Sequence, residues 1–313
     1  MLGLELSRAF FEECGRPMLE ESFSELLPYL AVGLFGSGSE CFGFDDETSQ
    51  DHDFEPGFCI FLPGEELVDR RAAFLLERAY AKLPKVYSGF HRASIAPVGG
   101  ARHGVLRTSA FFLEKVGSAD GTLSLERWLT LPEQALAEAT NGELYFDRYG
   151  EVTRIRERLS YFPEDVRRKR LAGQLLLMAQ SGQYNYLRCL KHGETAAAQL
   201  AVVEFVRSAV SAAFLLSRRY QPYYKWCFRA LRALPLLTDL ADVSEWLLTT
   251  GNEEEQAREK YDVIEQIASD VISLLQEQEL TKAICGDLEK HAYSVNDGIT
   301  DAEVRNLHIL AAI

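Results

Sequence analysis

Two short hydrophobic runs, with small and acidic residues between them, constrain the fold of this chain most strongly. The first run ends at Leu34-Phe35 and continues into Gly36-Ser37, and the second starts beside Asp51 and Asp53 and ends at Leu62. Runs of this length suit buried strands. Because alternate residues of a strand point to the same side, the carboxylates of Asp51 and Asp53 would converge on one point.

Composition and charge exclude several classes of protein. The chain has 313 residues, 47% of them hydrophobic, and a formal net charge of −14. This charge makes nucleic acid an unlikely partner, because phosphate backbones require a basic face. No run of about 18 apolar residues or secretory signal is evident, so we expect a cytoplasmic protein with no membrane partner. Six scattered cysteines without a CxxC pair favour reduced thiols.

The order of the expected elements predicts an α+β protein with two domains. Residues 1–120, with an N-terminal helix over Leu4–Leu30, mix strands and helices, and residues 121–313 form an all-α helical bundle. We expect strands at Ala31–Phe35, Phe54–Leu62, Gly104–Ser109 and Leu144–Phe146. We expect helices at Glu65–Leu83, Asp165–Ser181, Glu194–Ser217, Tyr223–Leu234, Ala241–Thr249 and Glu253–Glu279.

The loop between the first two strands predicts a phosphate and metal site. Glycine allows close approach of the backbone, and the N–H groups and hydroxyls of Gly36, Ser37 and Ser39 could bind nucleotide phosphate. Two carboxylates suit Mg²⁺, which prefers oxygen ligands and leaves positions open for phosphate. We therefore predict nucleotide binding at the Gly/Ser segment, with Asp51 and Asp53 as metal ligands and catalytic residues.

The order strand, Gly36-Ser37, gap and Asp51-His52-Asp53 resembles the signature of the nucleotidyltransferase superfamily. The segments Thr48–Phe54, Tyr145–Gly150 and Gln221–Arg229 narrow this resemblance to the family called domain of unknown function 4037. The resemblance implies a small mixed sheet with helices, followed by a helical domain. It also implies Mg²⁺ with ATP or another nucleoside triphosphate, and transfer of a nucleoside monophosphate to a hydroxyl of an unknown small molecule or protein.

The chain departs from the superfamily at the third carboxylate. The matching strand offers Arg107 and Thr108 and no acid. A base for the acceptor hydroxyl must lie within hydrogen-bond reach of it. Four alternatives stay open for this base: Glu143, Asp147, Asp165 and His52. Without one, the chain is a catalytically inactive nucleotide-binding module, and a weaker alternative is a purely structural helical scaffold.

Three polar clusters in the helical half have a functional and a structural interpretation. Tyr184 and Arg188, at i and i+4, could line a nucleotide cleft or form a hydrogen-bond cluster between helices. Lys225 could neutralise a triphosphate. The basic residues between Arg154 and Arg170 predict a solvated helix face, or a surface that attracts an anionic acceptor.

Overall fold

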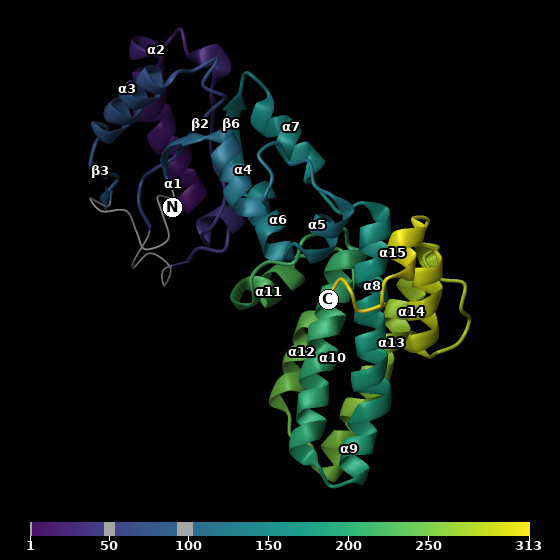
Figure 1. Ribbon diagram of the computed structural model, residues 1–313. Helices are drawn as coiled ribbons and strands as arrows, with labels where there is room; N and C mark the ends of the chain where they lie inside the picture. The colour runs from purple at the N-terminus through teal and green to yellow at the C-terminus, as the bar shows by residue number, and fades with distance from the viewer. Residues whose placement is uncertain (1, 47–53, 93–102) are drawn as a thin grey trace. The chain divides into compact units, whose positions relative to one another are not determined.

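The computed structural model describes residues 2–46, 54–92 and 103–313, and it confirms the α+β class (Figure 1). The chain forms two compact units. The first comprises Met1–Leu123 and Pro132–Ser160, and the second comprises Ser124–Leu131 and Tyr161–Ile313. This division differs from a single boundary at residue 120, because the chain returns to the first unit to add a strand to its sheet.

The sheet of the first unit is small and mixed. Its strands are β1 (Ala31–Leu34), β2 (Cys59–Leu62), β5 (Gly104–Arg107) and β6 (Glu143–Asp147), in the order β5-β2-β1-β6. Strand β1 pairs antiparallel with both β2 and β6, whereas β2 and β5 are parallel. A second sheet contains β3 (Val86–Tyr87) and β4 (Phe90–His91). Strand β2 is shorter than the expected Phe54–Leu62, because residues 54–58 form no strand.

Helices surround this sheet in the first unit. The expected helix over Leu4–Leu30 is divided into α1 (Gly3–Phe10), a π-helical segment η1 (Phe11–Gly15), α2 (Arg16–Ser22) and a 3₁₀ turn η2 (Leu27–Tyr29). The remaining helices are η3 (Glu40–Phe42), α3 (Arg70–Ala81), α4 (Thr108–Val116), α6 (Glu133–Thr140) and α7 (Glu151–Arg158). Aromatic side chains from the N-terminal helix and from the residue before β2, including Phe10, Phe11 and Phe58, are fully buried in the core.

The second unit is the expected helical bundle. Its helices are α5 (Leu125–Thr130), α8 (Glu164–Met178), the π-helical segment η5 (Ala179–Tyr186), α9 (Leu187–Lys191), α10 (Thr195–Leu216), α11 (Tyr224–Leu231), α12 (Leu240–Thr249), α13 (Glu254–Glu277), α14 (Leu288–Asp297) and α15 (Ala302–Asn306). Helices α8 and α10 run side by side (Figure 1). Helix α10 has the length and hydropathy of a membrane span, but 67% of its apolar window is buried inside the protein, as in a core helix.

The basic residues of α8 correct the expectation of a solvated helix face. Arg167 is 2% exposed and Lys169 is fully buried. The Lys169 ammonium donates to the carbonyl of Leu307 at 2.7 Å and to the Asn296 side chain at 2.8 Å. Arg170 donates to the carbonyl of Leu131 at 2.8 Å. These cations donate hydrogen bonds to acceptors near helix ends and in loops and are not exposed to solvent. Burial lowers the pKa of Lys169.

The pairing of β1 with β6 gives a prediction about stability. The register shifts between Val32 and Gly33, and a Cβ added at Gly33 would overlap the Glu143 carbonyl and lie 2.9 Å from Leu144 Cα. We expect Gly33→Ala to lower the free energy of unfolding by about 1–3 kcal/mol, because backbone atoms must move. Urea denaturation measures this change. Gly286→Ala is the control, since a Cβ there meets open space; equal stability of both variants would contradict the prediction.

Candidate functional site

The predicted phosphate-binding segment forms a turn directly after β1. We call residues 36–39 the Gly-Ser turn. Gly36 and Gly38 have φ values of +123° and +124°, a backbone conformation that L side chains rarely adopt. At Gly38 a Cβ would also come within 2.6 Å of the Glu40 carboxylate carbon. Both glycines are therefore required by the backbone path of the turn.

Asn141 fixes the first residue of the turn. Its side-chain oxygen accepts from the Gly36 N–H at 2.8 Å, and its side-chain nitrogen donates to the Gly36 carbonyl at 2.8 Å. The next N–H, that of Gly142, donates to the Cys41 carbonyl at 2.8 Å. Gly36 therefore contributes its backbone conformation to the turn, while its N–H already donates a hydrogen bond to Asn141.

The next three backbone N–H groups are different. Within the described part of the chain, the N–H groups of Ser37, Gly38 and Ser39 donate no hydrogen bond. Ser37 and Ser39 are half-buried at the surface of the unit. Successive unpaired N–H groups carry partial positive charge and can bind an anion. The turn thus presents donors where the sequence predicts phosphate binding.

A lysine contacts the turn from α4. The Lys115 ammonium donates to Ser37 Oγ at 2.6 Å and to Glu138 Oε2 at 2.7 Å. Ser37 Oγ donates to the same Glu138 oxygen at 2.7 Å, and Gln134 donates to Oε1 at 3.1 Å. The side chains of Lys115 and Glu138 are 16% and 11% exposed, respectively. We call Ser37, Lys115 and Glu138 the polar triad.

Two opposing effects determine the ionisation of Glu138. Burial raises its pKa, but hydrogen bonds from Lys115, Ser37 and Gln134 together outweigh burial and lower the pKa below its ordinary value of 4.5. Glu138 therefore holds Lys115 in place as an ion-pair partner. Sequence reasoning missed Lys115 and Glu138, because they lie 78 and 101 positions after Ser37 and neither belongs to a recognisable motif.

The predicted metal ligands Asp51 and Asp53, together with His52, lie outside the described residues. Nearby in the sequence, Asp45 is a buried carboxylate with 6% exposure. Its Oδ2 accepts from the Gly3 N–H at 2.6 Å, and its Oδ1 has no hydrogen-bond partner among the described residues. In the described ranges, no group of three His, Cys, Asp or Glu side chains is arranged to hold a metal ion.

The three described candidates for a general base each have structural partners. Glu143 pairs with Arg8, whose Nε lies 3.0 Å from Glu143 Oε2. Asp147 accepts from the N–H groups of Gly150 and Thr153, both at 2.7 Å, around the start of α7. Asp165 accepts from the Thr300 hydroxyl at 2.7 Å and from the Asp301 N–H at 2.8 Å.

The strand expected to carry the third carboxylate presents other groups. Arg107 donates to the Pro63 carbonyl at 2.6 Å, and the Thr108 hydroxyl donates to the Leu62 carbonyl at 3.1 Å. Both side chains therefore donate hydrogen bonds to carbonyl groups at the C-terminal end of β2.

The remaining predicted nucleotide ligands belong to the second unit. Tyr184 lies on η5 with 60% exposure, and Arg188 on α9 donates to its hydroxyl. Lys225 is exposed on α11, with its ammonium 4.8 Å from the centroid of the Trp226 ring. Tyr184 and Arg188 thus form one contact pair, and Lys225 lies on a separate helix of the same unit.

The ionisation of Glu138 gives a pH prediction. Because the pKa of Glu138 is lowered on folding, its contribution to stability is present above pH 4.5 and is lost as the pH falls through the folded-state value. We expect Glu138→Gln to reduce the free energy of unfolding by about 1–3 kcal/mol at pH 7. The difference from wild type should shrink on acidification, as followed by urea denaturation between about pH 3 and pH 7. A difference that does not depend on pH would contradict this role.

Comparison with known proteins gives a family match and a structural similarity. The model of the family described as domain of unknown function (DUF4037) matches residues 128–227. No curated protein matches the chain. A solved nucleotidyltransferase-like protein from Exiguobacterium sibiricum has 12% sequence identity and a TM-score of 0.37, covering 92% of this chain and 81% of its own. The match over residues 128–227 supports the expected family for that part of the chain.

Proposed function

We propose that the chain binds a Mg²⁺–nucleoside triphosphate, ATP or another, at the Gly-Ser turn and transfers a nucleoside monophosphate to a hydroxyl. The acceptor would be a small molecule or a protein. One observation carries the proposal: the N–H groups of Ser37, Gly38 and Ser39 donate no hydrogen bond within the described chain, and Lys115 lies 2.6 Å from Ser37 Oγ. Several N–H donors with an adjacent cation form an environment suited to phosphate.

The proposed magnesium ligands are Asp51 and Asp53. Carboxylate oxygens are the ligand type that Mg²⁺ prefers. Asp45, six residues before Asp51, is a buried carboxylate whose Oδ1 has no hydrogen-bond partner among the described residues. When bound, the ion would neutralise charge that develops on the reacting phosphate.

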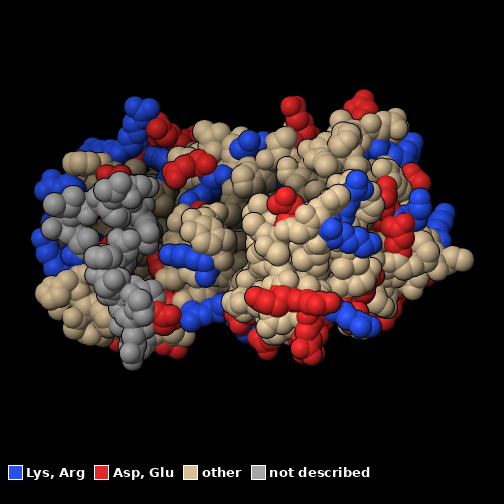
Figure 2. Space-filling view, turned by 90° about the horizontal axis from the view of Figure 1, so that it is seen from below, with Lys and Arg blue, Asp and Glu red and all other residues tan. Residues whose placement is uncertain are grey.

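In this proposal, residues of the first unit hold the phosphates. Lys115, oriented by Glu138, would contact phosphate oxygens beside Ser37. Tyr184, Arg188 and Lys225 lie in the second unit, and their roles as nucleotide ligands stay predictions from the sequence. Membrane and nucleic acid are not proposed as partners. On the face that Figure 2 draws, acidic and basic side chains are interspersed and form no broad basic area.

A second candidate function is nucleotide binding without turnover. The partners of Glu143, Asp147 and Asp165 favour it, because a carboxylate that already caps a helix or pairs with arginine must break these contacts to accept a proton. Breaking a hydrogen bond to a charged group costs about 1.5–3 kcal/mol. The two candidates share the same binding site and differ in turnover.

The proposed site predicts magnesium-dependent nucleotide binding. We expect saturable heat in calorimetric titration with Mg²⁺–ATP or Mg²⁺–GTP, and loss of the magnesium-dependent part in Asp51→Asn/Asp53→Asn. An Asp69→Asn variant is the matched control, because asparagine can also serve as the helix cap that Asp69 provides. Equal binding by wild type and the double variant, or no binding by wild type, would reject the proposed site.

The polar triad allows a sharper version of this measurement. Glu138→Gln keeps the Lys115 cation and removes its competing carboxylate, so we expect nucleotide affinity that is unchanged or higher. Lys115→Met/Glu138→Gln removes the cation without leaving a buried unpaired acid, so we expect affinity about tenfold lower. Identical affinities of these two variants would show that Lys115 does not contact phosphate.

Turnover separates the two candidate functions. If the chain is a transferase, wild type should release pyrophosphate from Mg²⁺–ATP or Mg²⁺–GTP when a panel of hydroxyl-bearing metabolites and proteins is added. Asp51→Asn/Asp53→Asn should reduce this release to background. Saturable nucleotide binding without release across the panel would favour the binding module.

A further inference from the structure

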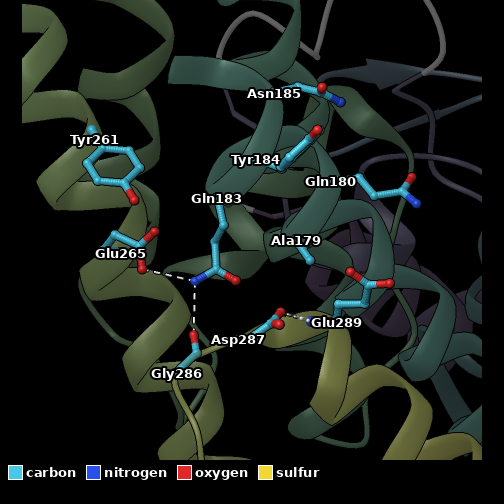
Figure 3. A pocket seen from close by; sticks show the side chains of 10 residues that line it. All are labelled: Ala179, Gln180, Gln183, Tyr184, Asn185, Tyr261, Glu265, Gly286, Asp287 and Glu289. Carbon is cyan, nitrogen blue, oxygen red and sulfur yellow. Dashed lines mark hydrogen bonds between the residues drawn. The ribbon is translucent and has the colours of Figure 1, made fainter. Parts of the chain in front are cut away.

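The second unit contains a pocket that its own residues form, with a volume of about 570 Å³ (Figure 3). Its walls come from the π-helical segment η5, from α13 and from the start of α14. This volume is within the range of about 300–1,000 Å³ that is usual for small-molecule sites. A π-helical segment inside a long helix is rare and often occurs at functional sites.

One glutamine connects the three walls. Gln183 Nε2 donates to Glu265 Oε2 at 2.9 Å and to the Gly286 carbonyl at 3.0 Å. Gln183 Oε1 accepts from the Leu288 N–H at 3.0 Å. Figure 3 shows Gln183 pointing across the pocket toward Glu265 and Gly286. The pocket therefore has its shape before any ligand binds, which reduces the entropic cost of binding.

The lining has a consistent chemical character. Three carboxylates, those of Glu265, Asp287 and Glu289, line the pocket together with the rings of Tyr184 and Tyr261. The lining contains no lysine or arginine, but the Arg188 guanidinium lies 5.5 Å from the centroid of the Tyr184 ring. Aromatic faces attract organic cations when the charge lies within about 6 Å of the ring. Carboxylates and aromatic rings together are therefore complementary to a ligand that is positively charged and has apolar carbon between its charges.

The distribution of the acids distinguishes an organic cation from a metal ion. No three acidic, histidine or cysteine side chains in the described chain converge closely enough to hold a metal. The three carboxylates are instead distributed over two walls, on α13 and at the start of α14. Glu265 is also engaged by Gln183 and by Tyr261, whose pKa is raised by burial and by its hydrogen bond to Glu265. Carboxylates on two different walls of the pocket match a ligand whose positive charges also lie apart.

We propose that this pocket binds a small organic polycation, such as a polyamine, with its ammonium groups on Asp287, Glu289 and Glu265 and its methylene chain against the tyrosine rings. This inference does not depend on the proposed nucleotide site. It also makes a phosphate-rich ligand unfavourable inside the pocket, because three carboxylates would repel it.

Spermidine is the probe for the test, titrated by calorimetry into the full chain at about 150 mM salt, where nonspecific attraction is screened beyond about 8 Å. The pocket variant is Asp287→Asn/Glu289→Gln. Asparagine can keep the helix cap that Asp287 gives to the Glu289 N–H, so α14 should still form, as circular dichroism can verify. The matched control, Asp270→Asn/Glu277→Gln, removes the same two charges from exposed positions of α13 outside the pocket.

We expect saturable binding of spermidine by wild type, affinity at least about tenfold lower in the pocket variant, and a change of less than about twofold in the control. Tyr184→Leu should weaken binding by a few fold, because it removes one aromatic ring. Three outcomes would overturn the proposal: no saturable binding by wild type, equal losses in both charge variants, or ATP binding that Tyr184→Leu abolishes and the pocket variant strengthens.

Discussion

The paired hydrogen bonds between Asn141 and Gly36 are the interaction on which the first unit's candidate site depends. They join the two segments two residues beyond the Leu34–Glu143 pair, where β1 has ended and the turn begins. The segment that provides Asn141 also contains α6 and therefore Glu138. Placing Asn141 against Gly36 thus places Glu138 against Ser37, and Lys115 follows through its ion pair.

Local patterns in the sequence predicted much of the fold. The hydrophobic runs that became β1, β2 and β5, and the apolar periodicity of α10 and α13, depend on neighbours within a few residues. Contacts between distant segments left no such pattern. No local pattern marked Asn141 as a partner of Gly36, yet its side-chain amide fixes a turn 105 residues earlier in the chain. Gly36-Ser37 indicated the turn, but no pattern in the sequence indicated the polar residues that contact it.

The basic residues of α8 show a second limit of prediction from local sequence, because a pattern was present but indicated the wrong environment. A run such as Arg167–Arg170 usually indicates solvent exposure, because burying a charge is costly without partners. Here carbonyl groups at helix ends and loops provide the partners, and Lys169 alone contacts three acceptors. Composition gives the charge of a segment, whereas the position of unpaired carbonyls is known only after the helices have packed. Asp147 and Asp165 likewise accept hydrogen bonds from backbone N–H groups, and the sequence does not identify these donors.

The Gly-Ser turn and the second-unit pocket have opposite local character in a chain whose net charge is −14. Attraction of an anion to the turn must therefore come from groups within a few ångströms, since salt screens exposed charges beyond about 8 Å. Backbone N–H groups with Lys115 can provide such a short-range field. Neutralising Lys115 by Glu138 weakens that field before a ligand arrives, so a phosphate must compete with a buried carboxylate for the same ammonium group. In the proposed function, affinity at the turn would thus depend on how readily Glu138 shares Lys115, and the polar triad would determine the strength of phosphate binding as well as its position.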